Sequence, residues 1–398
     1  MKKNKSIAVF TGNRAEYGLQ YPILQALKAE KDIDYHLIVS GAHLDPNFGA
    51  TLNEIDSDGF EIYQEVKINL DNDDLFSTAK AIGTGVVEIA NVLDRLNPDF
   101  FVVYADRFEG LAAVIASSQM GIPTAHIEGG DITEGGALDD SVRHAMTKLS
   151  HLHFTTNKEA SKRISDMGEE QWRINTVGFP AIDLIAENNY AKPNEISTRL
   201  DIDLSRPIVL FTQHSVTTEF KEAKNQLLES IDALKKISNE GVQVILTYPN
   251  NDAGGLSIVN ELNSLEMKEN ENIIITNSLG RYLYHGILAL SIDKKRVCCA
   301  GNSSSGIKET PALGCPTVNI GSRQDGRLRA SNVIDCDYKS SEIVDSIMKC
   351  LFDDKFRNHC LEIENPYYLG GAGKKIVEIL KNTPINKKLL QKKMTLKY

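Results

Sequence analysis

The sequence predicts an α/β protein with two domains, each built on a parallel β-sheet. Short apolar segments alternate with stretches whose apolar residues recur at helical spacing, which is typical of a parallel sheet covered by helices on both faces. This alternation pauses at residues 178–205 and then begins again. A chain of 398 residues is long enough for two domains. We therefore place the first domain at residues 1–180 and the second at residues 181–365.

The first domain is expected to alternate strands and helices up to residue 156. The predicted strands are residues 6–11, 35–40, 101–104, 124–127 and 153–156. The predicted helices are residues 20–28, 48–56, 77–96, 110–118 and 140–149. The helix at 77–96 shows the clearest pattern, because Ile82, Val86, Ile89 and Leu93 recur along one helix face.

The second domain repeats this rhythm. The predicted strands are residues 208–213, 242–247, 273–276, 296–300 and 317–320. The predicted helices are residues 221–236, a segment after the loop 248–255, and residues 281–290 and 307–313. A last helix is predicted at residues 374–380, and the Lys-rich tail at 384–398 is expected to lie on the surface.

Composition excludes several classes of protein. The formal net charge of −10 argues against a nucleic-acid partner. No stretch reaches the roughly 18–20 apolar residues that a membrane span needs, and the first apolar segment is too short for a signal peptide, so we expect a cytoplasmic protein. All six cysteines lie in the last third and form no C-x-x-C pair. We interpret them as buried, reduced thiols rather than zinc ligands or disulfides.

Three acidic residues mark the candidate catalytic site. Asp106 and Glu128 each follow a predicted strand, and Asp140 opens a predicted helix. Ligands of open parallel sheets bind at the carboxyl ends of the strands. Carboxylates gathered there repel one another, so at least one should hold a proton and serve beside a charged one in acid–base catalysis. Arg143, on the same helix face as Asp140, would keep that carboxyl ionised. The alternatives are solvent-facing loop charges and a helix N-cap at Asp139 or Asp140.

Two turns between strand and helix are candidate phosphate sites. Arg14, in the turn 12–16, suits a phosphate at a helix N-terminus, although the turn lacks G-x-G-x-x-G and gives a dinucleotide little support. The segment 301–306, GNSSSG, offers hydroxyl and N–H groups to an anion but is not a P-loop. An ordinary turn and a Ser-rich helix cap are the alternatives.

Two further polar residues follow strands of the second domain. Glu309, one turn after the GNSSSG segment, would accept hydrogen bonds from the two hydroxyls of a ribose. His214 ends the first strand and would donate to a phosphate or act on a leaving group. A single histidine after a strand is more often structural, so its assignment depends on this context.

Taken together, these motifs resemble the hydrolysing UDP-N-acetylglucosamine 2-epimerases, in the branch that serves sialic-acid-type sugar synthesis. The resemblance covers essentially the whole chain and rests on TGNRAEYG, YADRFEG, HIEGGDITEGGALDDSVRHAMTKLSHLHF, TVGFPAID, YPNNDAGG, GNSSSGIKETPALGCPTVNIGSRQDGR and NPYYLGGAGKKI. The non-hydrolysing enzymes read GTRPE, HVEAGLR and PEE-x-NR where this chain reads TGNRAE, HIEGGDI and LDDSVR.

The resemblance implies a GT-B architecture, in which two Rossmann-like domains with parallel sheets face a central cleft. It implies that the C-terminal segment at about 366–398 packs back on the first domain and that the protein is a homodimer. The implied reaction eliminates UDP across C1–C2 of the UDP-sugar to give a 2-acetamidoglucal, and hydration then yields N-acetylmannosamine. It uses no metal or nicotinamide cofactor.

The resemblance also assigns roles to single residues. Asp106, Glu128 and Asp140 match the catalytic carboxylates. The sequence does not decide which is base and which is acid, and we expect Asp106 or Glu128 to be the base at C2 and Asp140 to orient the substrate or complete the hydration. His214 joins them as a catalytic and diphosphate-binding residue. The implied substrate contacts are Arg14, Arg107, Arg143, Asn250, Ser303, Ser304, Gly306, Glu309 and Arg323.

Other functions stay open on the sequence. The same chemistry on UDP-N,N′-diacetylbacillosamine, in the legionaminic acid pathway, would be decided by positions such as His43 and the loop 131–138. A non-hydrolysing epimerase keeps the proton transfer at C2 but not the release of UDP. A GT-B glycosyltransferase would share the nucleotide site without needing C2 deprotonation, and a protein that only binds its ligand would have no use for three carboxylates.

Overall fold

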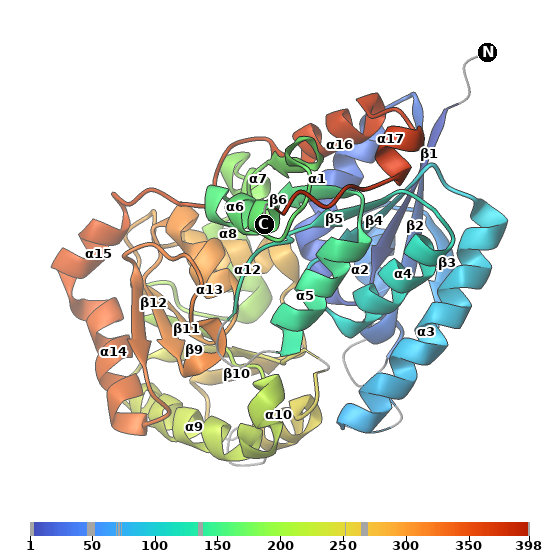
Figure 1. The fold of residues 1–398 in the computed structure, drawn as a ribbon. Coiled ribbons are helices and arrows are strands. Elements are labelled where there is room, and N and C mark those ends of the chain that lie inside the picture. The colour runs from blue at the N-terminus through green and yellow to red at the C-terminus, as the bar shows by residue number, and fades with distance from the viewer. Residues whose placement is uncertain are drawn as a thin grey trace. The chain divides into compact units, whose positions relative to one another are not determined.

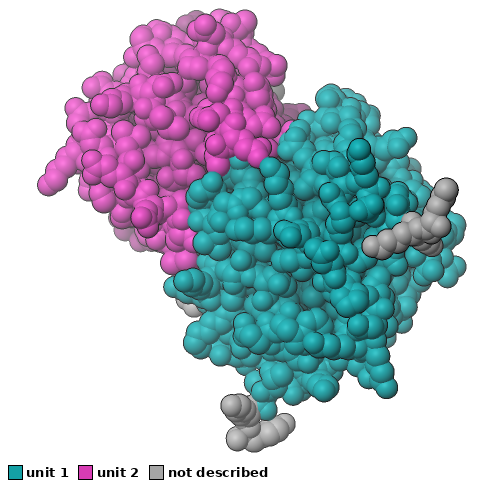
Figure 2. All heavy atoms as spheres, turned by 90° about the horizontal axis from the view of Figure 1, so that it is seen from above, with its two compact units in different colours: residues 1–132, 138–183, 367–398 teal, residues 133–137, 184–366 magenta. Residues whose placement is uncertain are grey.

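The computed structural model divides into two compact units, which Figures 1 and 2 show. It describes residues 4–45, 52–68, 70, 72, 74–133, 138–250, 252–263 and 270–396. Unit 1 comprises Met1–Ile132, Leu138–Asp183 and Tyr367–Tyr398, and unit 2 comprises Thr133–Ala137 and Leu184–Pro366. Each unit contains one parallel sheet with helices, so the predicted α/β class is confirmed.

The sheet of unit 1 has seven parallel strands in the order β3-β2-β1-β4-β5-β6-β7. Their bounds are β1 Lys5–Thr11, β2 Ile33–Ser40, β3 Ile62–Val66, β4 Phe100–Tyr104, β5 Thr124–Ile127, β6 Leu152–Thr155 and β7 Ile174–Thr176. The two strands of this sheet that the sequence did not predict, β3 and β7, are its edge strands, which carry few buried apolar residues. The direction of strand addition reverses between β1 and β4, and such a switch point is where open sheets bind ligands.

The helices of unit 1 cover this sheet. They are α1 Arg14–Ala29, α2 Leu52–Ser57, α3 Leu75–Leu96, α4 Phe108–Gln119, α5 Leu138–Leu149, α6 Lys158–Asp166, α16 Ala372–Asn382 and α17 Lys387–Leu390, while α7 Ala181–Ala186 spans the change of unit. Helix α4 packs between α3 and α5, and α16 packs against α1. Helix α1 begins six residues before the predicted start, because the Asn13 side chain caps it by accepting the Glu16 N–H at 3.0 Å. The predicted helix 48–56 is described only from Leu52.

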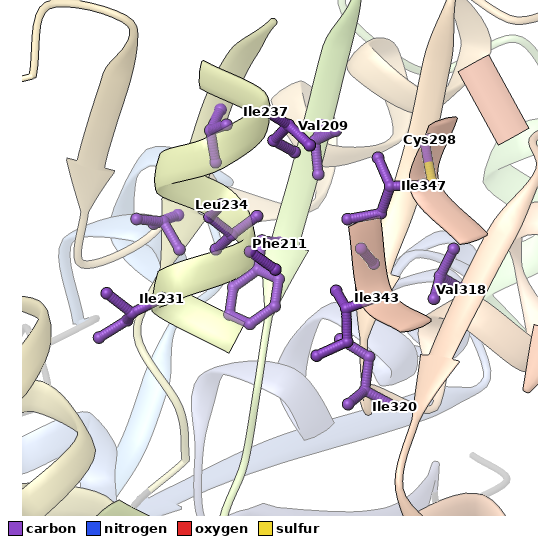
Figure 3. Close-up of a cluster of buried hydrophobic side chains, with 14 of the residues drawn as sticks. Val209, Phe211, Ile231, Leu234, Ile237, Cys298, Val318, Ile320, Ile343 and Ile347 are labelled. Carbon is purple, nitrogen blue, oxygen red and sulfur yellow. The ribbon is translucent and has the colours of Figure 1, made fainter. Parts of the chain in front are cut away.

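Unit 2 has six parallel strands in the order β10-β9-β8-β11-β12-β13, with a switch point between β8 and β11. The strands are β8 Ile208–Thr212, β9 Gln243–Thr247, β10 Ile273–Thr276, β11 Val297–Gly301, β12 Thr317–Ile320 and β13 Val333–Cys336. The helices are α8 Pro193–Leu200, α9 Ala223–Asn239, α10 Gly255–Leu262, α12 Gly280–Ala289, α13 Ser305–Lys308, α14 Ser340–Phe352 and α15 Asp354–Cys360. Figure 3 shows part of the core, where Ile343 and Ile347 of α14 lie beside Val318 and Ile320 of β12.

Unit 2 differs from the sequence-based expectation in several places, and strand β13 and helices α14 and α15 were not predicted. The predicted helix 307–313 is two short pieces, α13 and the 3-10 turn Thr310–Leu313, because Pro311 has no N–H to continue the helical hydrogen bonds. The pause in the pattern contains helix α8. All six cysteines are free thiols, five buried and Cys336 partly buried, as predicted. Among the described residues, no helix combines the length and apolar character needed to cross a membrane.

Most of the described C-terminal tail is exposed, as predicted, but Leu389 and Lys392 pack against the rest of unit 1. Leu389 is only 1% exposed. The Lys392 ammonium binds the Glu169 carboxylate at 2.8 Å and donates to the carbonyls of Lys148 at 2.7 Å and Ser150 at 2.6 Å. These carbonyls lie at the C-terminal end of α5, so the tail caps that helix with a positive charge.

The Lys392 contact predicts a stability effect. Lys392→Met leaves the buried Glu169 with fewer partners and uncaps α5, so we expect the free energy of unfolding to fall by about 1–3 kcal/mol. The matched control is Lys393→Met, since the Lys393 side chain is exposed and should change stability by less than about 0.5 kcal/mol. Urea unfolding measures both. Equal stability of the two variants would contradict the packing of the tail.

The histidines buried in unit 1 lead us to predict that the stability of the protein depends on pH. Burial lowers the pKa of His126 to about 3 and that of His151 to about 4. The unfolded chain binds a proton on each near pH 6.5 and the folded chain does not, so stability is greatest above that pH and falls as the pH is lowered through it. Between pH 8 and pH 5.5, each histidine should lower the free energy of unfolding by about 1.4 kcal/mol.

His151→Asn tests this pH dependence. Asparagine keeps an acceptor for the Thr124 N–H, which His151 Nδ1 accepts at 3.1 Å, and it does not titrate. The decline in unfolding free energy between pH 8 and pH 5.5 should therefore be smaller by about 1.4 kcal/mol than in the unmodified protein. An identical decline in both would show that His151 is not held neutral by burial.

Candidate functional site

The structure joins two of the predicted carboxylates through one arginine. Asp106 lies two residues after β4, while Asp140 and Arg143 lie on α5. The Arg143 guanidinium is fully buried. It forms an ion pair with Asp106 and donates to Asp140 at 2.6 Å and to the Asp131 carbonyl at 2.9 Å. The side chains of Asp106 and Asp140 stay 18% and 21% exposed, so neither carboxylate is closed off from solvent.

The N-cap alternative for the paired aspartates does not fit the structure. Helix α5 already includes Leu138, so Asp139 and Asp140 lie inside its first turn. Negative charge in the first turn interacts favourably with the helix dipole, and Arg143 one turn later completes the pairing of Asp140.

Glu128 lies directly after β5 in an unusual backbone conformation. Its φ is +65°, and Ala105, which precedes Asp106, has φ +53°. Left-handed conformations at alanine and glutamate cost on the order of 1 kcal/mol or more, so surrounding contacts must hold them. The Glu128 N–H donates to the Phe154 carbonyl at 2.8 Å, and the Ala105 N–H donates to the Ile127 carbonyl at 3.0 Å. Backbone strain therefore occurs at the two strand ends that carry Asp106 and Glu128.

A further pair of carboxylates, which the sequence analysis did not single out, lies at the same switch point. Glu16 and Glu109 are both buried. Burial, and then the charge of Glu109, raises the pKa of Glu16 to about 8, so Glu16 is mostly protonated at neutral pH. The Gly12 N–H donates to Glu16 at 2.8 Å, and Arg107 pairs with Glu109 at 3.2 Å. Glu16 lies in the motif TGNRAEYG and Glu109 in the motif YADRFEG, so these two motifs could have identified the pair from the sequence.

The side chain of Arg14 lies outside the described part of the structure, which places only its backbone, at the start of α1. His43 is buried, with Nε2 at 3.0 Å from the Thr11 hydroxyl. The loop 131–138, expected to influence the choice of sugar, is described except for residues 134–137.

In unit 2, Asn302 organises the candidate nucleotide-binding residues. Its side chain accepts the His214 N–H at 2.7 Å and donates to the His214 carbonyl at 2.9 Å, which ties β8 to β11 at their carboxyl ends. Its own carbonyl accepts from Arg323 at 3.1 Å and from Gln324 at 2.8 Å. Sequence reasoning missed Asn302, although it is the second residue of the GNSSSG segment.

The His214 ring is oriented by the next loop. Its Nδ1 accepts the Asn250 N–H at 3.0 Å, so the proton of the neutral ring is on Nε2. An Nε2–H group can donate to a phosphate oxygen, which suits the predicted role. The structure thus brings His214, Asn250 and Arg323 together around Asn302.

The rest of the GNSSSG region is held by aromatic and imidazole partners. Ser303 Oγ lies 3.0 Å from Ser305 Oγ, which lies 2.6 Å from the Tyr284 hydroxyl. Ser304 and Gly306 flank Ser305 at the start of α13. His285 Nε2 lies 2.7 Å from Glu309 Oε2, a contact that fixes the carboxylate predicted to bind ribose. Among the described residues, no cluster of His, Cys, Asp or Glu is arranged to hold a metal ion.

Comparison with solved structures agrees with this architecture. The UDP-GlcNAc 2-epimerase of Neisseria meningitidis, solved with UDP-GlcNAc, has a TM-score of 0.76 and 19% identity, and the match covers 95% of this chain and 100% of that one. The Methanocaldococcus jannaschii enzyme, solved with UDP-GlcNAc and UDP, has the same scores and coverage. The fold is accordingly GT-B-like.

Curated relatives are more similar in sequence. The hydrolysing UDP-N,N′-diacetylbacillosamine 2-epimerase of Legionella pneumophila is 34% identical over 98% of both chains. The hydrolysing GDP/UDP-N,N′-diacetylbacillosamine 2-epimerase of Campylobacter jejuni is 35% identical over 84% of this chain and 85% of that one. A UDP-N-acetylglucosamine 2-epimerase of Neisseria meningitidis serogroup B is 30% identical, with 88% and 89% covered.

The family described as UDP-N-acetylglucosamine 2-epimerase matches residues 25–381 of this chain. This match includes every strand of the two sheets except β1, and it includes the Asp106–Arg143–Asp140 arrangement and the Asn302 region. Together with the identities over nearly the whole chain, it shows that the protein belongs to the UDP-N-acetylglucosamine 2-epimerase family.

Proposed function

We propose that the protein is a hydrolysing 2-epimerase that converts a UDP-linked 2-acetamido sugar and water into the free 2-epimeric sugar and UDP. The observation that carries this proposal is the Asp106–Arg143–Asp140 arrangement, with Glu128 at the neighbouring strand end. Elimination needs a base at the weakly acidic C2–H, and hydration needs a second group that moves a proton. Three carboxylates, two of them fixed by one buried arginine, suit both requirements.

In the first step, Asp106 or Glu128 removes the C2 proton. The electron pair of that C–H bond forms the C1=C2 double bond, and the C1–O bond breaks, so UDP leaves with the electrons of that bond. Arg143 keeps Asp106 in the charged form that can act as a base, since it donates to the carboxylate from a buried position. The product of this step is a 2-acetamidoglucal.

In the second step, water adds across the double bond. The hydroxyl goes to C1 and the proton to C2, on the face opposite to that of the first step, which inverts C2. We assign proton transfer in this step to Asp140, whose orientation is fixed by its 2.6 Å hydrogen bond from Arg143. The free sugar and UDP then dissociate.

We assign UDP binding to unit 2. His214 Nε2–H and the Arg323 guanidinium would donate to the diphosphate and stabilise the charge on the leaving group, as donors placed near a developing anion do. Ser303, Ser304 and Gly306 would add hydroxyl and N–H donors, and Glu309, held by His285, would accept from the ribose hydroxyls. The protein would act as a cytoplasmic homodimer.

Two sugars fit this chemistry, because it needs only a C2–H, a 2-acetamido group and UDP at C1. The relatives named diacetylbacillosamine 2-epimerases are 34–35% identical to this chain, and the relative from Neisseria meningitidis serogroup B named UDP-N-acetylglucosamine 2-epimerase is 30% identical. This difference favours UDP-N,N′-diacetylbacillosamine as the substrate in the legionaminic acid pathway. UDP-N-acetylglucosamine, on the way to sialic acid, is the second candidate.

Proton NMR in heavy water tests the reaction and the substrate together. We expect turnover of one of the two UDP-sugars to free UDP and a free sugar that carries deuterium at C2, because the hydrogen that reaches C2 in the hydration step comes from a group in exchange with the solvent. Faster turnover of the 2,4-diacetamido sugar nucleotide would assign the legionaminic branch. Formation of an epimeric UDP-sugar without free UDP would contradict hydrolysis, and a product with protium at C2 would contradict the elimination.

A pair of variants separates the chemistry from UDP binding. Asp106→Asn should lower kcat by about 10²–10⁴-fold, because the amide cannot take the C2 proton, with UDP affinity unchanged. His214→Ala should weaken UDP binding about tenfold, since one donor to the diphosphate is lost. Calorimetric titration with UDP and steady-state kinetics measure the two effects.

Asp99→Asn is the matched control for Asp106→Asn. Asp99 lies just before β4, where it accepts the Ser6 N–H at 2.9 Å, and Asp106 follows the other end of the same strand. We expect kcat of Asp99→Asn to stay within about twofold of the unmodified enzyme. Full activity of Asp106→Asn would refute its role in the chemistry.

A further inference from the structure

His126 connects β5 to the strained backbone in front of Asp106. It is completely buried. Its Nε2 lies 2.7 Å from the carbonyl oxygen of Ala105, and its Nδ1 lies 3.1 Å from the hydroxyl of Thr147. Ala105 directly precedes Asp106, and Thr147 lies one turn after Arg143 on α5. The imidazole therefore contacts both segments that carry the Asp106–Arg143 pair.

The chemistry of these contacts fixes the tautomer. A carbonyl oxygen can only accept, so the ring proton must be on Nε2. Burial lowers the pKa of His126 to about 3, so the ring is neutral and Nδ1 is an acceptor. The single proton of the Thr147 hydroxyl then lies between two acceptors, Nδ1 at 3.1 Å and the Arg143 carbonyl at 3.0 Å, which share it. The resulting chain runs from the Thr147 hydroxyl through the imidazole to the Ala105 carbonyl.

Gly129 gives independent evidence that the sequence is adapted to the contact between His126 and Thr147. A Cβ atom at Gly129 would lie 2.8 Å from His126 Nδ1 and 2.9 Å from Thr147 Oγ1. Both distances are too short for a carbon atom, and neither neighbour can move away without breaking the hydrogen bond. The first glycine of HIEGG is therefore required by the contact between the imidazole and the hydroxyl.

The contact also explains how the backbone at Ala105 keeps φ +53°. The N–H of Ala105 donates to the Ile127 carbonyl, and its carbonyl accepts from His126. With both polar groups of Ala105 held by β5, the chain cannot relax without losing a buried hydrogen bond. The direction in which Asp106 leaves the strand is set by this residue.

We propose that His126, oriented by Thr147, is a positioning residue that fixes the backbone before Asp106 and so aims the Asp106 carboxylate at Arg143 and the reacting carbon. This inference rests on the proposed function, because it assigns His126 a role in the same reaction. His126 does not itself transfer a proton to the substrate.

The test compares three substitutions of buried threonine hydroxyls in the full-length protein. Thr147→Val removes the donor to Nδ1 and should lower kcat about five- to tenfold while UDP affinity stays unchanged. Thr147→Ser keeps the hydroxyl and should retain kcat within about twofold. Thr124→Val is the control, since Thr124 is also buried, at the start of β5, but its hydroxyl lies 2.8 Å from that of Ser117 and not on the Ala105 side of His126.

Kinetics and thermal unfolding together decide the outcome. A structural role alone would lower Tm equally in the two valine variants and leave kcat equal, and that result would overturn the proposal. Loss of kcat in Thr147→Val but not in Thr124→Val, with recovery in Thr147→Ser, would support it.

Nitrogen NMR of labelled histidine gives a readout that does not depend on turnover. At pH 7 His126 should show the Nε2–H tautomer, and the Nδ1 shift should change in Thr147→Val and not in Thr124→Val. A protein that turns over neither UDP-sugar would refute the proposed function while leaving these shifts as predicted. The Nδ1–H tautomer at His126 would refute the positioning role whatever the activity.

Discussion

The candidate catalytic site of unit 1 depends on the buried guanidinium of Arg143. It pairs with Asp106 after β4 and with Asp140 on its own helix, and it donates to the Asp131 carbonyl after β5. A buried arginine without such partners would carry a large desolvation cost, so the carboxylates and the arginine require one another. This mutual requirement fixes the position of α5 relative to the ends of two strands.

The strained residues follow from the same constraint. To bring Asp106 to Arg143, the chain turns at Ala105 with φ +53°, and Glu128 turns at φ +65°. The free energy stored there is offset by buried hydrogen bonds from β5, β6 and His126. A site whose backbone is held in this way needs little rearrangement before it acts, which is the condition for effective acid–base catalysis.

The two units share a strand topology but place different kinds of side chain at its switch point. Both sheets reverse their strand order next to the first strand, at β1/β4 and at β8/β11. In unit 1 the reversal point gathers carboxylates, including a pair in which Glu16 holds a proton near neutral pH. In unit 2 it gathers donors around Asn302, which suits an anion. The tail of the chain returns to unit 1 and caps α5 through Lys392, so the helix that carries Asp140 and Arg143 is held at its C-terminal end as well.

The sequence by itself determined the α/β class, the positions of most strands and long helices, and the family, because hydrophobic periodicity and short motifs are local properties. It missed the edge strands β3, β7 and β13 and the burial of Leu389, since their packing depends on residues far away in the chain. The sequence shows the type of each residue and its place in a motif, but it does not show which residues that side chain contacts. Asp106, Asp140 and Arg143 were singled out, whereas Glu16, Glu109, His126 and Asn302 were not, although all four lie inside the motifs that were read.

Only the tertiary structure decided how those side chains meet. The proton held by Glu16 follows from burial beside Glu109, which α1 and α4 bring together from separate parts of the chain. The neutral tautomer of His126 follows from the carbonyl and hydroxyl on either side of it. Charge state and hydrogen-bond direction depend on distance and on exclusion of water, and neither is set until distant segments have packed.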